Sequence, residues 1–512
     1  DYRLHKTLTF PFWTILHNRT VGPAILCLPR GFYASGCAVA IPAMIFATSM
    51  FIFNSYRLLA CWRVESEKNH QIERRLQEVQ ALLQNAGGGG GGNDPNNHTN
   101  IGGAGVSGGV MNPNDSLNIH VARSPKRKAP VKQAPKQQYG AIALEQDTFF
   151  QAKLLTYPEL AKRALGSHAV FVELGIALFQ FGVCLTYLIF VPDNLAQCYM
   201  GVMGGGGEPP NKLIFLWLMI LVEMPLSWIR DVRKLTPTNV LATFLILFGL
   251  LAVLVIAFYQ GTQQSIEADD ADELVFVHNL KSLKPLTETW FLFIGTSFFM
   301  MEGSVTLLVP LQEAVFRKED KAQFPNMNRN VTSYICLFYI IFSAIACAAF
   351  GSKIQTALTA SLPPGSLATL VQLAYSIAVI LTFPLQAFPA MEVAIRMVDQ
   401  IRGTHSSSSS SSYYKTSKAV DWKRNGYATV IVIGLGIIAV CAIDYLGNVV
   451  SILGSLFGIP LALVFPPLMH NQLVQDSSTL TRWTNYGVVV IGLFAMAAAS
   501  YNAIVMWDAG AE

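Results

Sequence analysis

The sequence predicts an all-α membrane protein with eleven transmembrane helices, arranged as two five-helix halves and one extra helix. The 512 residues are 52% hydrophobic and only 13% charged, with a mean hydropathy of +0.40, a balance that soluble domains rarely show. The apolar residues are grouped in segments of about 20, the length that crosses a bilayer as a helix. A short pattern also recurs in the first and sixth segments. These three observations predict the fold class.

The hydrophobic segments fall along the whole chain, with two long interruptions. The predicted spans lie near residues 9–29, 36–62, 167–191, 212–229, 236–259, 289–315, 331–350, 366–395, 427–446, 448–469 and 485–507. Most Lys and Arg residues of the short loops lie on one side of this model, near 230–234, 317–329, 396–424 and 482. The loops on the other side carry Arg30, Lys212, Lys281, Lys284 and Lys353. By the positive-inside rule, the N-terminus is expected to be cytosolic.

Two polar segments separate the spans into three groups, so the chain has five parts. Ile72, Leu76, Val79 and Leu83 recur at helical spacing, so span 2 is expected to continue as an amphipathic helix. A Gly- and Asn-rich run and a basic run follow, and both are typical of disorder. The basic run is either a site for anionic lipid or a solvated tail. The predicted parts are 1–62 (spans 1 and 2), 63–166 (cytosolic insertion), 167–395 (spans 3–8), 396–426 (Ser-rich cytosolic linker) and 427–507 (spans 9–11).

An internal echo links span 1 and span 6. Residues 22–29 read GPAILCLP and residues 303–310 read GSVTLLVP, with the same Gly-to-Pro spacing. Because each half has five spans, the halves enter the membrane in opposite orientations. Interrupted helices at matching places in inverted halves indicate a transporter's binding site. The echo therefore predicts a break in each of the two helices.

The chemistry of a broken helix suits a zwitterion. Freed N–H groups and a half-helix N-terminus, with roughly half a positive charge, hold a carboxylate, and freed carbonyls hold an ammonium. An amino acid backbone presents both groups, so we predict an amino acid substrate. The predicted substrate-binding residues at the breaks are Val21, Gly22, Pro23, Ala24, Met301, Gly303 and Ser304.

Glu302 is an ionisable residue at the predicted bilayer depth of span 6. Such residues are costly and usually mark a pathway or a site. Its alternatives are a partner for the substrate ammonium, a carrier of the coupling proton, or a helix cap at the break; we predict proton coupling. Glu173 and Glu223 lie in spans 3 and 4, where structural pairing competes with a transport role.

Enzyme classes find little support in the sequence. The spans show no nucleophile constellation and no metal-ligand spacing, and none of the eight cysteines forms a CxxC pair. We therefore predict no enzyme, no cofactor, no metal site and no nucleic-acid partner. The expected partners are an amino acid, a proton, the lipid bilayer and a cytosolic protein at 63–138.

Several motifs together resemble the amino acid/auxin permease family, especially its proton-coupled and vacuolar amino acid transporters. The matching residues are Gly22, Leu26, Leu28 and Pro29 in span 1, Phe298, Phe299, Glu302, Gly303, Pro310 and Leu311 in span 6, and the stretches 182–195, 229–237 and 375–393. The resemblance covers roughly residues 9–507 without the two insertions. Ala24 stands where this family usually has its second glycine, beside an unusual Pro23, which makes the first break bulkier.

The resemblance implies a LeuT-type inverted repeat and a function. It places Tyr187 and Thr382, on spans 3 and 8, near the substrate. It implies a secondary active, proton-coupled amino acid transporter that works by alternating access. The expected location is a vacuolar or lysosomal membrane, or otherwise the plasma membrane. The alternative is an amino acid receptor that signals through its cytosolic segment.

Overall fold

The computed structural model describes residues 23–87, 155–203, 210–229, 235–263, 274–315, 318–401, 418–505 and 507. All the elements assigned in these ranges are helices. The chain divides into two compact units, residues 1–67 with 154–512 and residues 68–153. Most of the predicted insertion, including the Gly-rich and basic runs and much of the expected partner segment, lies outside the described residues, as does most of the Ser-rich linker.

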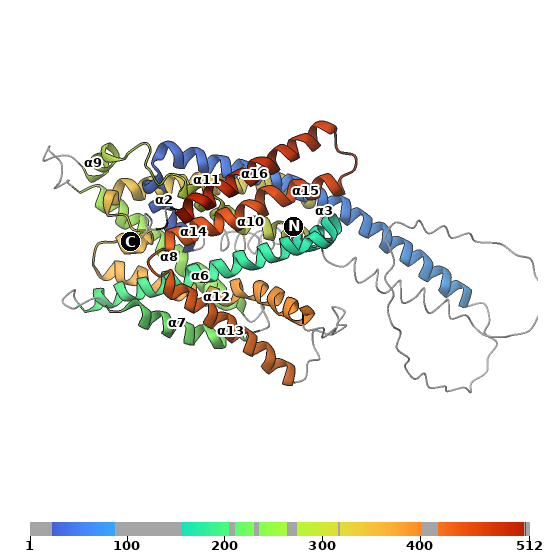
Figure 1. Cartoon of the computed structure of the whole chain (residues 1–512), viewed down its shortest axis with the longest axis horizontal. Helices are drawn as coiled ribbons and strands as arrows, with labels where there is room; N and C mark the ends of the chain where they lie inside the picture. The colour runs from blue at the N-terminus through green and yellow to red at the C-terminus, as the bar shows by residue number, and fades with distance from the viewer. Residues whose placement is uncertain are drawn as a thin grey trace, which may run out of the picture. The chain divides into compact units, whose positions relative to one another are not determined.

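The helices follow the predicted spans in order (Figure 1). A 3-10 turn, η1 (Pro23–Cys27), leads into α2 (Leu28–Ser35). The long helices are α3 (Cys37–Gly87), α6 (Ala169–Val202), α7 (Lys212–Ser227), α8 (Thr236–Gly261), α10 (Leu292–Ala314), α11 (Lys318–Phe350), α12 (Ser366–Ile401), α13 (Lys418–Cys441) and α16 (Thr479–Val505). Shorter helices are α5 (Tyr157–Leu165), α9 (Val275–Ser282), α14 (Leu446–Leu453) and α15 (Phe465–Leu473).

Nine helices of the described residues are long and apolar enough to cross a membrane. The expected eleven are not reached for two reasons. Helix α7 has only 16 residues and would extend about 24 Å at 1.5 Å per residue, which is short for a bilayer core of about 30 Å. Span 1 lies mostly before Pro23, outside the described residues. The structure is therefore an all-helical membrane protein in which the predicted count of eleven is not confirmed.

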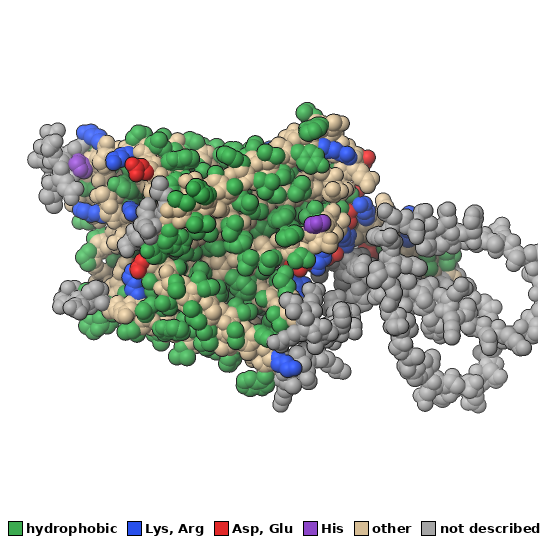
Figure 2. Space-filling view, in the orientation of Figure 1, with side chains coloured by type: hydrophobic (Ala, Val, Ile, Leu, Met, Phe, Trp, Pro, Cys, Tyr) green, Lys and Arg blue, Asp and Glu red, His purple; other side chains and the backbone are tan. Residues whose placement is uncertain are grey.

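The core of the larger unit is built from helices that are distant in sequence. Helix α12 packs along both α6 and α8, and α10 packs against α14 and the turn that follows it. The surface between the ends of the unit is apolar, and Figure 2 shows Lys, Arg, Asp and Glu gathered toward its two ends. Large hydrophobic side chains such as Phe244, Leu251 and Phe494 are well exposed on this surface. This distribution is what a lipid-facing helix bundle requires.

Helices α10 and α14 meet backbone to backbone. A Cβ atom at Gly295 would collide with the carbonyl oxygen of Ser451, and one at Gly454 would collide with that of Gly295. The Ser451 hydroxyl also donates a hydrogen bond of 2.8 Å to the Leu292 carbonyl. Small residues allow this approach, as is common where membrane helices pack closely. We call this contact the glycine joint.

Three local features differ from the sequence-based expectations. Helix α10 is assigned as continuous, so the break predicted near Gly303 is not seen in its backbone. Irregular geometry occurs instead in predicted span 10, where two π-helical segments, Gly454–Gly458 and Pro460–Val464, separate α14 from α15. Helix α11 begins at Lys318 rather than near 331, because the basic stretch before the span continues the helix.

Candidate functional site

The residues predicted at the two breaks are only partly placed. Val21 and Gly22 lie outside the described residues. Pro23 and Ala24 begin the 3-10 turn η1, and Ala24 is partly buried. On α10, Met301 is fully buried in the core. The structure thus places the start of the first motif in an irregular turn directly before α2.

The middle of α10 holds the other predicted site residues. Glu302, Gly303 and Ser304 have helical backbones, and their side chains lie outside what the structure describes. The roles predicted for Glu302 and its neighbours therefore stay predictions.

Tyr187 and Thr382 are both buried, on α6 and α12. The Thr382 hydroxyl donates to the carbonyls of Ala378 and Val379, at 3.0 and 3.1 Å. This bonding to its own helix uses the hydroxyl hydrogen that a ligand would otherwise accept. The placement of these two residues near a substrate also stays a prediction.

A cavity of about 110 Å³ lies between α2, the first turn of α10 and the start of α14. Its polar lining comes from Arg30 on α2, Thr289 and Thr296 beside and on α10, Thr356, and Asn448 on α14. Leu292, Phe293 and Val450 provide apolar wall. Concave sites with a few convergent polar groups on an apolar wall are typical of small-molecule binding. This space, which we call the Arg30 cavity, is the candidate substrate site.

Arg30 is the one charged residue among those that line the cavity. Its Nη1 donates to the Ile354 carbonyl at 3.0 Å, which uses one of the five donors of the guanidinium. On the facing helix, the Asn448 amide donates to the Trp507 carbonyl at 2.5 Å, and its Oδ1 has no hydrogen-bond partner among the described residues. A planar guanidinium matches a carboxylate, and an unpaired amide oxygen can accept from an ammonium.

The cavity is connected to a larger polar network through the segment between α11 and α12. This segment holds Ile354, the partner of Arg30, and Thr359, whose hydroxyl contacts the Asn194 side-chain oxygen on α6 at 2.5 Å. Gln372 of α12 donates to Gln197 of α6 at 3.1 Å and to the Thr359 carbonyl at 3.0 Å. The segment therefore ties the wall of the cavity to α6 and α12.

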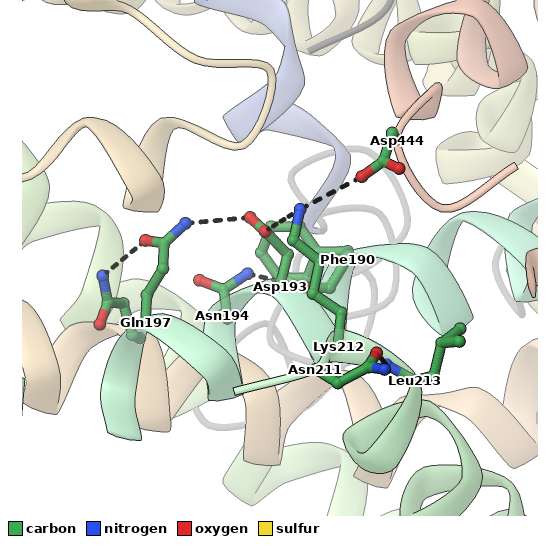
Figure 3. A network of polar contacts seen from close by, with 9 residues as sticks. Phe190, Asp193, Asn194, Gln197, Asn211, Lys212, Leu213 and Asp444 are labelled. Carbon is green, nitrogen blue, oxygen red and sulfur yellow. Dashed lines mark hydrogen bonds and ion pairs between the residues drawn. The ribbon is translucent and has the colours of Figure 1, made fainter. Parts of the chain in front are cut away.

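Lys212 closes this network at the start of α7. Figure 3 shows its ammonium between Asp193 of α6 and Asp444 of the α13–α14 connection, at 3.0 and 3.4 Å. Gln197 also donates to Asp193 at 3.0 Å. The basic-residue pattern predicts that this end of the bundle faces away from the cytosol.

The structure distinguishes Glu173 from Glu223, for which the sequence left the same two alternatives open. Glu173 pairs with Lys162 of α5 at 2.8 Å. Glu223, in contrast, is fully buried, and neither of its oxygens has a hydrogen-bond partner among the described residues. Glu392 and Asp444 pair with Arg424 and Lys212. In the described ranges, no group of three His, Cys, Asp or Glu side chains could hold a metal ion.

Comparison with known proteins identifies the family of this chain. A family model described as "transmembrane amino acid transporter protein" matches residues 145–505, about two thirds of the chain. The chain belongs to the transmembrane amino acid transporter family. This membership confirms the resemblance that the motifs indicated. The matched residues include the cavity lining from α10, Thr356 and α14, but not the lining from α2.

Curated relatives include vacuolar transporters. "Vacuolar amino acid transporter 3" of Saccharomyces cerevisiae is 30% identical over 356 residues, 69% of this chain and 48% of that protein. The protein of the same name from Schizosaccharomyces pombe is 29% identical over 68% of this chain and 48% of its own length. "Amino acid transporter ANT1" of Arabidopsis thaliana is 24% identical over 68% of this chain and 77% of its own. The chain thus spans about half the length of the two yeast relatives, and the family and these relatives are transporters rather than enzymes.

Sequence reasoning did not place Arg30 at the cavity. It was assigned to a short loop after span 1, whereas α2 continues through it to Ser35. Pro29 lies in the first turn of α2, where proline favours a helix start, and this signal predicts that the helix continues beyond Arg30. Asn448 had no comparable signal, because an amide in an apolar segment does not show which cavity it faces.

Proposed function

We propose that this protein is a secondary active transporter that moves amino acids by alternating access, driven by a proton gradient. Family membership supports amino acid transport, and the names of the yeast relatives support a vacuolar membrane. A cytosolic N-terminus, eleven spans and a LeuT-type inverted repeat complete the proposal. The observation that carries it is the Arg30 cavity, a polar pocket beside the first turn of α10.

Two groups in the cavity suit the two charges that all amino acid backbones share. The Arg30 guanidinium offers its unused donors to the substrate carboxylate. The Oδ1 of Asn448 is buried in this state and has no partner among the described residues, so an opening of the cavity toward it would offer an acceptor to the ammonium. Because the apolar wall contains no charge, it leaves side-chain selectivity to shape. In the predicted orientation, a substrate enters this cavity from the side opposite the cytosol.

Uptake by purified protein in liposomes tests the proposal. A panel of radiolabelled amino acids is offered with and without an imposed pH gradient, to wild type and to Arg30→Gln. We expect uptake of at least one amino acid, and an increase in KM of ten- to a hundredfold in the variant, because a charge-assisted hydrogen bond contributes about 1.5–3 kcal/mol. Lys284→Gln is the matched control, since Lys284 is an exposed basic residue on the same predicted side.

The outcome also decides between transport and sensing. A receptor would bind an amino acid with the same dependence on Arg30 but would show no flux at any gradient. Flux that is unchanged in Arg30→Gln would place the substrate elsewhere, with the predicted break residues of α10 as the next candidates.

A further inference from the structure

Glu223 is a buried carboxyl group without a described partner. It lies on α7, has no exposed surface, and both Oε1 and Oε2 are inaccessible and without a hydrogen-bond partner among the described residues. Its helix packs against α6, α12 and α13. No ion pair to Glu223 is formed by any described Lys, Arg or His.

The groups around Glu223 do not compensate a negative charge. From α6, the thiol of Cys184 is the titratable group that faces it. Toward α13, Ile220, one turn earlier on α7, lies against Gly436. On the half of α12 and α13 nearest the predicted cytosolic end, Glu392 and Arg424 pair with each other. Among the described residues the surroundings therefore offer no cation, and Cys184 would add only repulsion if it ionised.

The energetics leave one stable form for this side chain. An isolated carboxylate in a low-dielectric interior costs far more than the folded state can supply, so such a group takes up a proton instead. A neutral carboxyl with both oxygens unpaired still costs about 1–3 kcal/mol, whereas leucine of similar size would cost nothing in polar terms. Packing thus gives no reason for a carboxyl at this position. Reversible binding of a proton would explain why a carboxyl group is present here.

A route for that proton leads toward the cytosolic end of α7. Ser227 lies four residues further on, on the same helix face, and lines a small cavity of about 10 Å³ with Phe388 and Arg424. That volume is close to what one water molecule needs. Pro225 stands between the two residues and removes one backbone donor from the last turn of α7. A water at Ser227 would thus lie one helical turn from Glu223.

We propose that Glu223 is the carrier of the coupling proton. In this state its carboxyl holds the proton away from water, and a rearrangement of α7 against α6 and α13 exposes it to the small cavity at Ser227, at the predicted cytosolic end. There an Oε–H bond breaks, the proton passes to water, and the carboxylate forms where water can solvate it. The proposal rests on the transport function proposed above and deepens it by naming the proton site. Glu302 was the residue predicted for this role.

Separate assays of coupling and of substrate translocation test the proposal. Glu223→Gln keeps the shape but cannot release a proton. In liposomes, we expect uptake driven by an imposed pH gradient to fall at least tenfold, while exchange of labelled for unlabelled substrate at equal pH stays within twofold of wild type. The pH dependence of uptake should flatten. Glu173→Gln is the matched control, because Glu173 is a carboxylate in a span that has an ion-pair partner.

Three results would overturn the assignment. Wild-type gradient-driven uptake in Glu223→Gln would place the proton elsewhere, and the same assay on Glu302→Gln would then test the residue first predicted. Loss of exchange together with loss of driven uptake would make Glu223 a structural residue. Absence of all uptake and exchange by wild type would refute the proposed function itself, a distinct result. As a measurement independent of flux, infrared difference spectra should show a protonated carboxyl band in wild type that is missing in Glu223→Gln.

Discussion

The two ends of helix α7 differ in whether an ionisable side chain has a partner of opposite charge. At its start, the half-exposed Lys212 has two carboxylate partners, Asp193 and Asp444. Three turns later, the fully buried Glu223 has none among the described residues. Ion pairs that water already screens contribute at most about 1 kcal/mol, whereas a charge without a partner is very costly at depth. Helix α7 therefore has ion-pair partners at its exposed start, where they contribute least to stability, and none described at its buried carboxyl. This contrast indicates that the arrangement at Glu223 serves function.

The strongest test of the contrast reverses the buried charge. Glu223→Lys would place an ammonium among apolar side chains where no described residue supplies an anion, and we expect a loss of stability of about 3–5 kcal/mol, or no folded protein. Thermal unfolding of the purified protein in detergent measures this. Glu223→Gln, which stays neutral, should melt near the wild-type temperature. Equal melting of all three proteins would mean that water reaches this side chain and that it is not isolated.

Arg30 is an intermediate case that sharpens the comparison. It is partly buried and has one backbone partner, the Ile354 carbonyl. Arg30→Lys keeps the charge but loses the planar fork that holds both a carbonyl and a carboxylate, so KM for the transported amino acid should rise about tenfold, equivalent to about 1.4 kcal/mol. Concentration-dependent uptake in liposomes measures it. An unchanged KM would show that charge alone, without the fork, accounts for any contribution of Arg30.

At the other end of the comparison, Lys212→Met removes the cation between two carboxylates. Asp193 and Asp444 are partly exposed, so we expect a destabilisation below about 1 kcal/mol that shrinks as salt is added. Melting temperatures at low and high salt measure it. The double variant Lys212→Met with Asp444→Asn should recover the loss, since one of the repelling charges is gone. A loss of several kcal/mol would contradict the view that this pairing is screened.

The smallest effect is expected at Thr382. Its hydroxyl is bonded within its own helix, so Thr382→Val should change KM less than twofold and leave uptake near wild type. The same uptake assay measures it. A large rise in KM would instead support the sequence-based placement of Thr382 at the substrate.

Hydropathy located the membrane helices well, because long apolar runs have few alternatives. The errors in the predicted fold came from short local patterns, namely helix caps and helix breaks. Helix α5 was missed although Thr156 accepts a hydrogen bond from the Glu159 backbone N–H, a capping pattern that the sequence shows as TYPE. The prediction of a break in α10 was wrong, because the backbone of α10 is helical throughout. A glycine and a proline permit an interruption of a helix but do not require one. Gly295 and Gly454, whose backbones meet, both lie outside the echoed motif.

The site was less predictable than the fold. The sequence showed that Glu173 and Glu223 lie in spans, but pairing depends on which helices meet. Lys162, the partner of Glu173, belongs to the helix that was missed. The Arg30 cavity is lined by residues from α2, α10 and α14. The sequence of any one of these helices does not predict that the three lie together. Buried polar contacts between distant helices are therefore where a structure adds most.

The glycine joint has a consequence for how the chain is made. The hydrogen bond between Ser451 and Leu292 links residues 159 positions apart. At a synthesis rate of about 5–20 residues per second, α10 enters the membrane roughly 10–30 seconds before its partner exists. Throughout that interval the bare backbone at Gly295 faces lipid or the insertion machinery. A ribosome that stalls before residue 446 would thus leave a chain with most of its helices made and this joint open.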